Sequence, residues 1–341
     1  MKSLAFALAG AACLAACSET GPADVGTDPA TLTVDATATW AFVALGQTAA
    51  QVAVTDAATS TGWDIAFNAT RVMLNGGAAG PAGVVGHCVC QNAGATDGQV
   101  EAMTSAAELA GFEAVTLAVV PADGDAWESD VFDAAISGWY AYDVTTHEVS
   151  AVSTEVWKVR GAGAAPEYAK LRVTDIADAT QASVRVTIEY AVQSSAGAPP
   201  GVVQTAVLDG RTGPVRFDFA TGATGETDGW DIMLDGYDIR INGGVSGTGG
   251  AGAVVADETF AAMTDASDAP AQTYRGDAFG GVFVMHPWYR YNLDGNHTIF
   301  PTFDVFLVRK GTAVYKIQII GYYNTAGDAR HITFRYERLD S

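Results

Sequence analysis

Positive charge is scarce in this 341-residue chain, where 18 Lys and Arg residues stand against 39 Asp and Glu residues and the formal net charge is −21. Binding to a nucleic-acid backbone requires clustered basic side chains, which the sequence does not contain, so nucleic acid is excluded as a partner. Hydrophobic residues make up 49% of the chain, which argues against wholesale disorder despite the charge. A chain of this length is expected to form two domains.

The sequence also lacks the motifs of common enzymes. It contains neither a G-x-S-x-G nucleophile elbow nor an H-E-x-x-H zinc motif. A G-x-G-x-x-G pattern does occur at residues 247–252, but no predicted helix follows that could direct its amides at a nucleotide. Residues 292–296 contain Asp-Gly and favour a hairpin turn over a calcium site. We therefore expect a protein that is not an enzyme and binds no nucleotide.

Cysteine is almost as rare, with four residues in the chain. Two of them lie in the first 17 residues, so a framework of several disulfides is excluded for the rest. His87, Cys88 and Cys90 form a short run with three interpretations. The cysteines form a disulfide in an oxidising compartment, they remain a pair of free thiols, or the three residues bind a metal ion, although such a site lacks a fourth ligand.

No segment beyond the N-terminus approaches 18 consecutive apolar residues, the length that a membrane-spanning helix needs. Residues 1–17 contain one Lys and a short apolar run, and they end in Leu-Ala-Ala-Cys. This pattern is typical of a bacterial lipoprotein signal peptide, with Cys17 as the acylated (palmitate-type) first residue of the mature protein. Ser18 follows instead of the Asp that retains lipoproteins in the inner membrane. We expect a lipid-anchored protein of the outer membrane or cell surface.

A long internal repeat organises the rest of the chain. Gly-Trp-Asp-Ile at residues 62–65 recurs at 229–232, and Asn-Gly-Gly at 75–77 recurs at 242–244, both 167 residues later. Three further blocks recur in the same order at offsets of 149 and 146, which indicates two copies of one domain. The predicted organisation is a flexible tether (18–31), a first domain (32–195), a linker (196–201) and a second domain (202–341).

Within each copy, polar and apolar residues mostly alternate, as they do in residues 183–190 and 330–338. This period of two predicts antiparallel β-strands. Helix-like patterns are confined to residues 100–112 and 257–264. The predicted fold class is therefore all-β, with two tandem antiparallel domains and at most one short helix in each.

The ordered blocks resemble the HmuY family of bacterial lipoproteins. The second copy carries Trp-Asp at 230–231, Arg-x-Asn followed by a glycine-rich loop at 240–247, and a final Ile-Thr-Phe-x-Tyr strand at 332–336. The resemblance implies an all-β surface lipoprotein that is not an enzyme and binds haem for iron acquisition. It also implies two partners, a haem donor protein and an outer-membrane haem transporter.

In this family, histidines or methionines hold the haem iron. The corresponding positions are Val144 and Leu293 near one ligand and Phe112 and Ala261 near the other, and none of these can bind iron. The nearby residues that can are His147, His297, Met103 and Met263, of which the two methionines are expected to be equivalent by the repeat. An aromatic haem pocket is expected from Trp139, Tyr140, Tyr142, Trp288, Tyr289 and Tyr291. The alternative is an envelope interaction module that uses the same β scaffold without haem.

Overall fold

The computed structural model describes residues 29–225 and 229–339, and it is built mostly of antiparallel strands. The all-β fold class expected from the sequence is confirmed. The predicted signal peptide and its lipidated Cys17 lie outside the described residues. Most of the predicted tether, residues 18–31, lies outside them as well, but its end is corrected, because strand β1 begins at Ala30.

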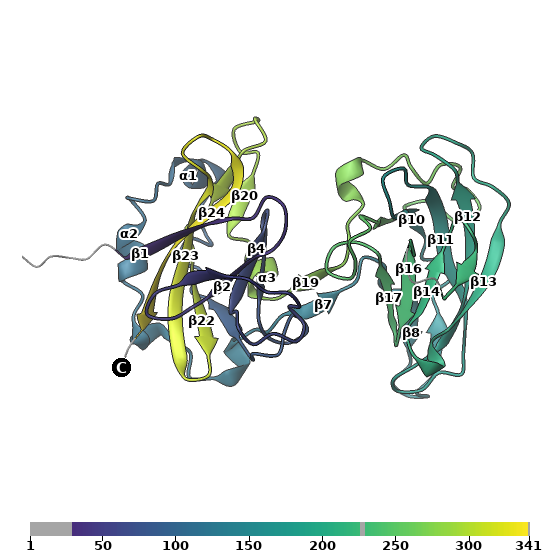
Figure 1. The fold of residues 1–341 in the computed structure, drawn as a ribbon, viewed down its shortest axis with the longest axis horizontal. Helices are drawn as coiled ribbons and strands as arrows, with labels where there is room; N and C mark the ends of the chain where they lie inside the picture. The colour runs from purple at the N-terminus through teal and green to yellow at the C-terminus, as the bar shows by residue number, and fades with distance from the viewer. Residues whose placement is uncertain (1–28, 226–228, 340–341) are drawn as a thin grey trace, which may run out of the picture.

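Two lobes make up the described chain (Figure 1). The first, here named the continuous lobe, consists of residues 134–277. The second, named the split lobe, combines residues 29–130 with residues 281–339. Strands β7 (Val131–Asp133) and β19 (Ala278–Gly280) pair antiparallel where the chain passes between the lobes.

Two sheets enclose the core of the split lobe. The five-stranded sheet has the order β1-β24-β23-β22-β6, formed by β1 (Ala30–Asp35), β6 (Val85–Cys88), β22 (Val305–Lys310), β23 (Ala313–Tyr323) and β24 (Ala329–Leu339). The second sheet has the order β3-β2-β4-β5, formed by β2 (Ala41–Ala44), β3 (Ala50–Val52), β4 (Ile65–Asn68) and β5 (Arg71–Leu74). Phe67 of one sheet stacks on Phe334 of the other at 5.4 Å between ring centroids, which shows how alternating apolar side chains fill the space between the sheets.

The continuous lobe repeats this plan. Its five-stranded sheet has the order β13-β12-β11-β10-β18, formed by β10 (Trp157–Arg160), β11 (Tyr168–Ala177), β12 (Arg185–Gln193), β13 (Gln204–Asp209) and β18 (Gly252–Val255). The second sheet has the order β15-β14-β16-β17, formed by β14 (Val215–Asp218), β15 (Ala223–Thr224), β16 (Ile232–Asp235) and β17 (Asp238–Ile241). Tyr190 and Phe217 meet edge to face between the two sheets.

Helical structure is limited to short segments in the described chain. The helices are α1 (Asp97–Ala102), α2 (Leu109–Glu113) and α3 (Val282–Met285), and the 3₁₀ turns are η1 (Leu117–Val119), η2 (Gly124–Ala126), η3 (Gly210–Thr212) and η4 (Ala271–Thr273). The helix expected over 100–112 is therefore two helices. The helix expected over 257–264 is wrong, because that segment forms turns whose carbonyls bond to a lysine of the sheet.

Each five-stranded sheet combines strands from both sequence copies. In the split lobe, the edge strands β1 and β6 come from the first copy and the three central strands come from the second. In the continuous lobe, the edge strands β13 and β18 come from the second copy and the three central strands from the first. The two copies have therefore exchanged halves within one chain.

The segment expected to link two domains, residues 196–201, has a different role in the structure. It lies between β12 and β13, which are hydrogen-bonded neighbours in one sheet. The segment is thus a hairpin loop inside the continuous lobe. The predicted domains 32–195 and 202–341 delimit the two sequence copies, and the packed lobes do not follow these boundaries.

The crossing strands show why the exchange is symmetric. Phe132 of β7 stands opposite Phe279 of β19, and Phe279 lies 147 residues after Phe132 in the sequence. Their ring centroids are 6.4 Å apart. On either side Val131 pairs with Gly280 and Asp133 pairs with Ala278. A local twofold axis therefore passes between the two phenylalanines, and each copy crosses to the other lobe in the same way.

This arrangement predicts that residues 131–281 fold alone. The fragment contains both sheets of the continuous lobe and its whole apolar core, so it should be a monomer with a cooperative thermal transition. The matched control is residues 32–195, which matches one sequence copy but takes strands from both lobes. Circular dichroism and size-exclusion chromatography check the result. A disordered 131–281 together with a monomeric, folded 32–195 would contradict the exchange.

Candidate functional site

A hairpin of the continuous lobe carries a tyrosine–histidine pair. Strand β8 (Tyr140–Tyr142) pairs with β9 (Val149–Ala151), and the Tyr142 hydroxyl lies 2.6 Å from Nδ1 of His147. The turn between the strands holds His147 at a positive φ of 61°, and its backbone N–H donates to the carbonyl of Asp143 at 2.8 Å. The imidazole is therefore positioned by both its ring and its backbone.

The split lobe contains the same pair at the same place. Strand β20 (Tyr289–Tyr291) pairs with β21 (Ile299–Pro301), and the Tyr291 hydroxyl lies 2.7 Å from Nδ1 of His297, whose φ is also 61°. Each histidine stands two residues before the second strand of its hairpin. The split-lobe turn has one additional residue before its histidine, so the first strand of the hairpin repeats at an offset of 149, whereas the histidine and the second strand repeat at an offset of 150.

The two pairs lie in different parts of the molecule. Figure 1 shows β8 near the lower end of the continuous lobe, whereas β20 lies near the upper end of the split lobe. His147 and His297, both candidate iron ligands, are therefore not brought together in one site. Each lobe has its own potential site, built around its own tyrosine–histidine pair.

A cavity of about 610 Å³ opens beside the pair of the continuous lobe. It is lined by Tyr140, Tyr142, His147, Val149, Ala179, Thr180, Gln181 and Tyr237. Tyr140 and Tyr237 lie 5.2 Å apart between ring centroids, and the Tyr237 hydroxyl donates to the carbonyl of Thr180 at 2.7 Å. Trp139, expected in the pocket, is only 1% exposed and packs beneath Tyr140 at 4.7 Å, outside this lining.

The cavity combines both sequence copies. Tyr140, Tyr142 and His147 belong to the first copy, whereas Tyr237 comes from the turn between β16 and β17 of the second copy. The sequence prediction therefore missed Tyr237, because only the exchange of halves places it here. It also missed the wall formed by residues 179–181, a loop with no aromatic or ligating residue.

The split lobe differs at the corresponding surface. At the repeat offset of 146, Tyr323 stands where the continuous lobe has Ala177. The Tyr323 hydroxyl accepts the N–H of Ile299 at 3.0 Å, and Ile299 corresponds to the cavity-lining Val149. At the offset of 167, Thr70 replaces Tyr237. Tyr323 thus covers the surface that is open in the continuous lobe.

The aromatic residues expected in the split-lobe pocket have different exposures. Trp288 is 2% exposed, belongs to the core and donates its indole N–H to the carbonyl of Thr70 at 2.9 Å. Tyr289 is half-buried against that core, and Tyr291 is exposed beside His297. Only the last of these three faces solvent at the hairpin.

The candidate methionines do not join either pair. Met263 is 2% exposed, and its carbonyl accepts a hydrogen bond from Lys170 near the start of β11, whereas the cavity lies beyond the other end of that strand. In the split lobe, Lys316 donates in the same way to the carbonyl of Val115. Met263 therefore corresponds to Val115, and the expected equivalence with Met103 is wrong. Met103 instead ends helix α1.

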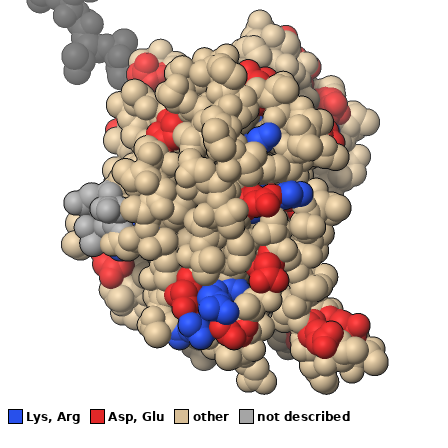
Figure 2. All heavy atoms as spheres, turned by 90° about the vertical axis from the view of Figure 1, so that its right-hand side faces the viewer, with Lys and Arg blue, Asp and Glu red and all other residues tan. Residues whose placement is uncertain are grey.

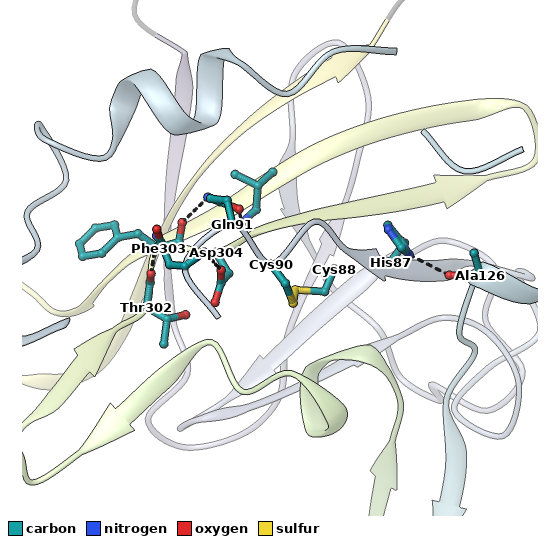
Figure 3. Close-up of a disulfide and its surroundings, with 10 residues drawn as sticks. His87, Cys88, Cys90, Gln91, Ala126, Thr302, Phe303 and Asp304 are labelled. Carbon is teal, nitrogen blue, oxygen red and sulfur yellow. Dashed lines mark hydrogen bonds between the residues drawn. A yellow bond between two sulfur atoms is a disulfide. The ribbon is translucent and has the colours of Figure 1, made fainter. Parts of the chain in front are cut away.

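Cys88 and Cys90 form a disulfide at the end of β6, so the disulfide interpretation of this run is the one realised (Figure 3). The His87 side chain points away from the sulfurs, and its Nδ1 lies 2.8 Å from the carbonyl of Ala126. His286 lies close to the sulfurs, but cysteines in a disulfide offer no thiolate to a metal.

The most conspicuous repeated motif is structural. In the continuous lobe, the carboxylate of Asp231 accepts the backbone N–H groups of Ala162 and Phe219, at 2.7 and 2.8 Å. The amide of Asn242 donates to the carbonyl of Trp230 at 2.7 Å. The corresponding aspartate and asparagine of the split lobe also bond to backbone groups. These buried side chains satisfy backbone groups in loops that no sheet pairs.

Two buried carboxyl groups titrate far from their ordinary range. Burial raises the pKa of Asp231 to about 7, and the nearby Glu167 and Asp218 reinforce the shift. Burial alone raises the pKa of Asp130 to about 7, although the N–H of Leu74 donates to it at 2.9 Å. Both groups lie away from the Tyr142–His147 pair, so they influence stability and not the candidate site.

The outer face of the continuous lobe is sparsely charged, and its basic side chains lie beside acidic ones (Figure 2). The ion pairs of this lobe include Arg172–Glu189 at 2.6 Å, Arg185–Asp178 at 3.0 Å and Arg211–Asp209 at 2.6 Å. Among the described residues no helix is long and apolar enough to cross a membrane.

Comparison with known families identifies the class of protein that this fold and site define. The family model of the HmuY protein matches residues 36–190 and 212–336, one segment in each sequence copy. The chain therefore belongs to the HmuY family, and it contains two tandem copies of the family domain. No curated protein matches the chain significantly.

Solved structures give weaker likenesses. A proposed HmuY-like haem-binding protein from Bacteroides vulgatus is 15% identical and covers 36% of this chain and 83% of its own, with a TM-score of 0.16. A proposed lipoprotein from Bacteroides fragilis is 15% identical, covering 47% and 91%, with a TM-score of 0.17. The apo HmuY analog from Tannerella forsythia is 14% identical, covering 63% and 96%, with a TM-score of 0.17. The family assignment rests on the family model.

The buried carboxyl groups predict that stability falls as pH rises from about 4 to 7. In that interval the folded protein retains protons on Asp130 and Asp231 that the unfolded chain has released, so the free energy of unfolding decreases with pH. Asp130→Asn keeps an acceptor for Leu74 and removes one titrating group. It should stabilise the protein at pH 8 by about 2–4 kcal/mol and flatten the decline, as measured by chemical denaturation.

The matched control is Asp209→Asn. Hydrogen bonding to Arg211 lowers the pKa of Asp209 to about 2, so this group is ionised in both the folded and the unfolded protein above about pH 5, and its replacement should leave the slope between pH 5 and 7 unchanged. An Asp130→Asn variant with the wild-type slope would contradict the assignment.

Proposed function

We propose that the protein binds haem in the cavity of the continuous lobe and does not act as an enzyme. The observation that carries this proposal is the tyrosine–histidine pair at the edge of an aromatic cavity of about 610 Å³. A volume of this order lies within the range of small-molecule and cofactor sites. Membership of the HmuY family and the haem-binding description of a related structure support it.

The lining suits an apolar, planar group with an iron atom. The rings of Tyr140 and Tyr237 supply apolar surface, and Tyr142 and His147 supply atoms that bind iron in other haem proteins. The lining residues include no Lys or Arg. Haem carboxylates would therefore be hydrogen-bonded by Thr180 and Gln181 or remain in solvent. Haem affinity would come from apolar contact and the iron, and not from charge attraction.

We also propose a place for the protein in the cell, which the N-terminal sequence supports. Acylation of Cys17 would hold it at the outer membrane or cell surface, as the lipoprotein description of one related structure supports. In that position it would take haem from a donor protein and pass it to an outer-membrane haem transporter. The open cavity mouth suits such transfer, because its lining tyrosine and histidine remain exposed.

A difference between the lobes provides the test. Ala177→Tyr introduces into the continuous lobe the residue that covers the corresponding surface of the split lobe. In a titration of residues 18–341 with ferric haem, followed by visible absorption, wild type should show saturable binding. Ala177→Tyr should weaken that binding about tenfold or more, a loss of at least about 1.4 kcal/mol.

The matched control is Tyr323→Ala, which uncovers the equivalent position of the split lobe, leaves the cavity of the continuous lobe unaltered and should not weaken haem binding. Equal affinity of wild type and Ala177→Tyr would place haem elsewhere. The absence of any saturable spectral change in wild type would reject haem binding and favour the haem-independent interaction module.

A further inference from the structure

We infer that the atom of this protein that binds the haem iron is the phenolate oxygen of Tyr142, and that His147 serves as the base that accepts the phenol proton. This inference rests on the proposed function and refines it. It differs from the expectation drawn from the family resemblance, in which histidines or methionines hold the iron.

The short contact between the two side chains determines which atom is available. The Tyr142 hydroxyl and Nδ1 of His147 are 2.6 Å apart, so one of them donates a hydrogen bond to the other. A phenol O–H is a stronger donor than a neutral imidazole N–H, and an imidazole nitrogen is a stronger acceptor than a phenol oxygen. The favoured arrangement has the hydroxyl donating to Nδ1.

This arrangement decides the histidine tautomer. A neutral imidazole that accepts at Nδ1 carries its proton on Nε2, so neither ring nitrogen of His147 offers a free lone pair to iron. The Tyr142 oxygen retains lone pairs on the side away from the hydrogen bond. Tyr142 is 51% exposed at the cavity wall, so its oxygen is accessible from the cavity.

The chemistry balances within the pair. As the oxygen of Tyr142 forms a bond to ferric iron, its O–H bond breaks, the proton moves to Nδ1 of His147, and the iron releases a bound water. No electron is transferred, and the iron stays ferric. The resulting imidazolium donates a charge-assisted hydrogen bond to the phenolate, which stabilises the bound state.

A phenolate ligand has a consequence for specificity. Phenolate is a hard, anionic donor that stabilises ferric iron more than ferrous iron, as tyrosine ligation in catalases illustrates. The protein should therefore prefer oxidised haem, and reduction of the iron should weaken binding.

The internal repeat indicates that the contact between Tyr142 and His147 is a maintained feature of the fold and not a chance contact. The Tyr291–His297 pair reproduces the distance, the hydrogen-bonding atoms and the positive φ of the histidine, although the turn that carries it is one residue longer. Because the Tyr323 hydroxyl accepts the N–H of Ile299 next to this hairpin, the split-lobe pair provides a matched control with the same local chemistry and different surroundings.

The experiment compares Tyr142→Phe, His147→Ala and Tyr291→Phe in residues 18–341, each loaded with ferric haem. Resonance Raman and visible spectra of wild type should show iron–phenolate vibrations and a charge-transfer band. Tyr142→Phe should lose both and weaken ferric haem binding about tenfold or more. His147→Ala should keep the phenolate signature with reduced affinity, and Tyr291→Phe should match wild type. Reduction with dithionite should weaken wild-type binding.

Several outcomes would overturn the inference while leaving haem binding in place. One is a wild-type spectrum in Tyr142→Phe combined with its loss in His147→Ala, which would make the histidine the ligand. Another is equal affinity of wild type for ferric and ferrous haem. No haem binding by wild type would instead reject the proposed function itself. Circular dichroism of the variants, whose substitutions lie on an exposed hairpin, verifies that they remain folded.

Discussion

The antiparallel pairing of β7 with β19 is the constraint on which the rest of the structure depends. At this pairing, both sequence copies cross from one lobe to the other, and Phe132 and Phe279 face each other across a local twofold axis. Because both crossings use equivalent residues, each lobe receives one complete set of strands and buries one complete core. The cavity of the continuous lobe depends on this exchange, because its aromatic residues come from both sequence copies.

Buried polar side chains make the two lobes alike where no sheet pairs the backbone. In each lobe an aspartate and an asparagine bond to loop backbone, and a buried lysine caps the carbonyls of a short turn. Desolvation is the cost of burying such groups, and it raises the pKa of Asp231 and also that of Asp130, a separate buried aspartate that accepts the N–H of Leu74. The lobes diverge elsewhere, at Ala177 and Tyr323, and that divergence separates an open cavity from a covered surface.

Sequence reasoning predicted the strands well, because alternation of polar and apolar side chains reports directly on a sheet with one buried face. It could not predict which copy each strand joins. Equivalent strands in the two copies have nearly the same pattern of polar and apolar residues. The sequence therefore cannot distinguish β12 from β24 as the neighbour of β1, and the crossing strands β7 and β19 determine which of the two pairs with it. For the same reason the sequence did not predict that Tyr237 lines the cavity. His147 and Tyr142 could be predicted as neighbours because they are close in sequence. The predicted equivalence of Met103 and Met263 was wrong because loops of different length in the two copies change the sequence offset between equivalent residues.

The exchange of halves also determines the order in which the two lobes can fold as the chain is synthesised. A chain that emerges from its N-terminus has every residue of the continuous lobe available once residue 277 has appeared. Strand β1 must wait for β24, and the hydroxyls of Thr33 and Thr333, 2.8 Å apart in space, are 300 residues apart in sequence. Closing so long a loop is slow and leaves the early strand edges unpaired in the meantime. The first strand to be made is thus among the last to be paired, beside a lobe that has already folded.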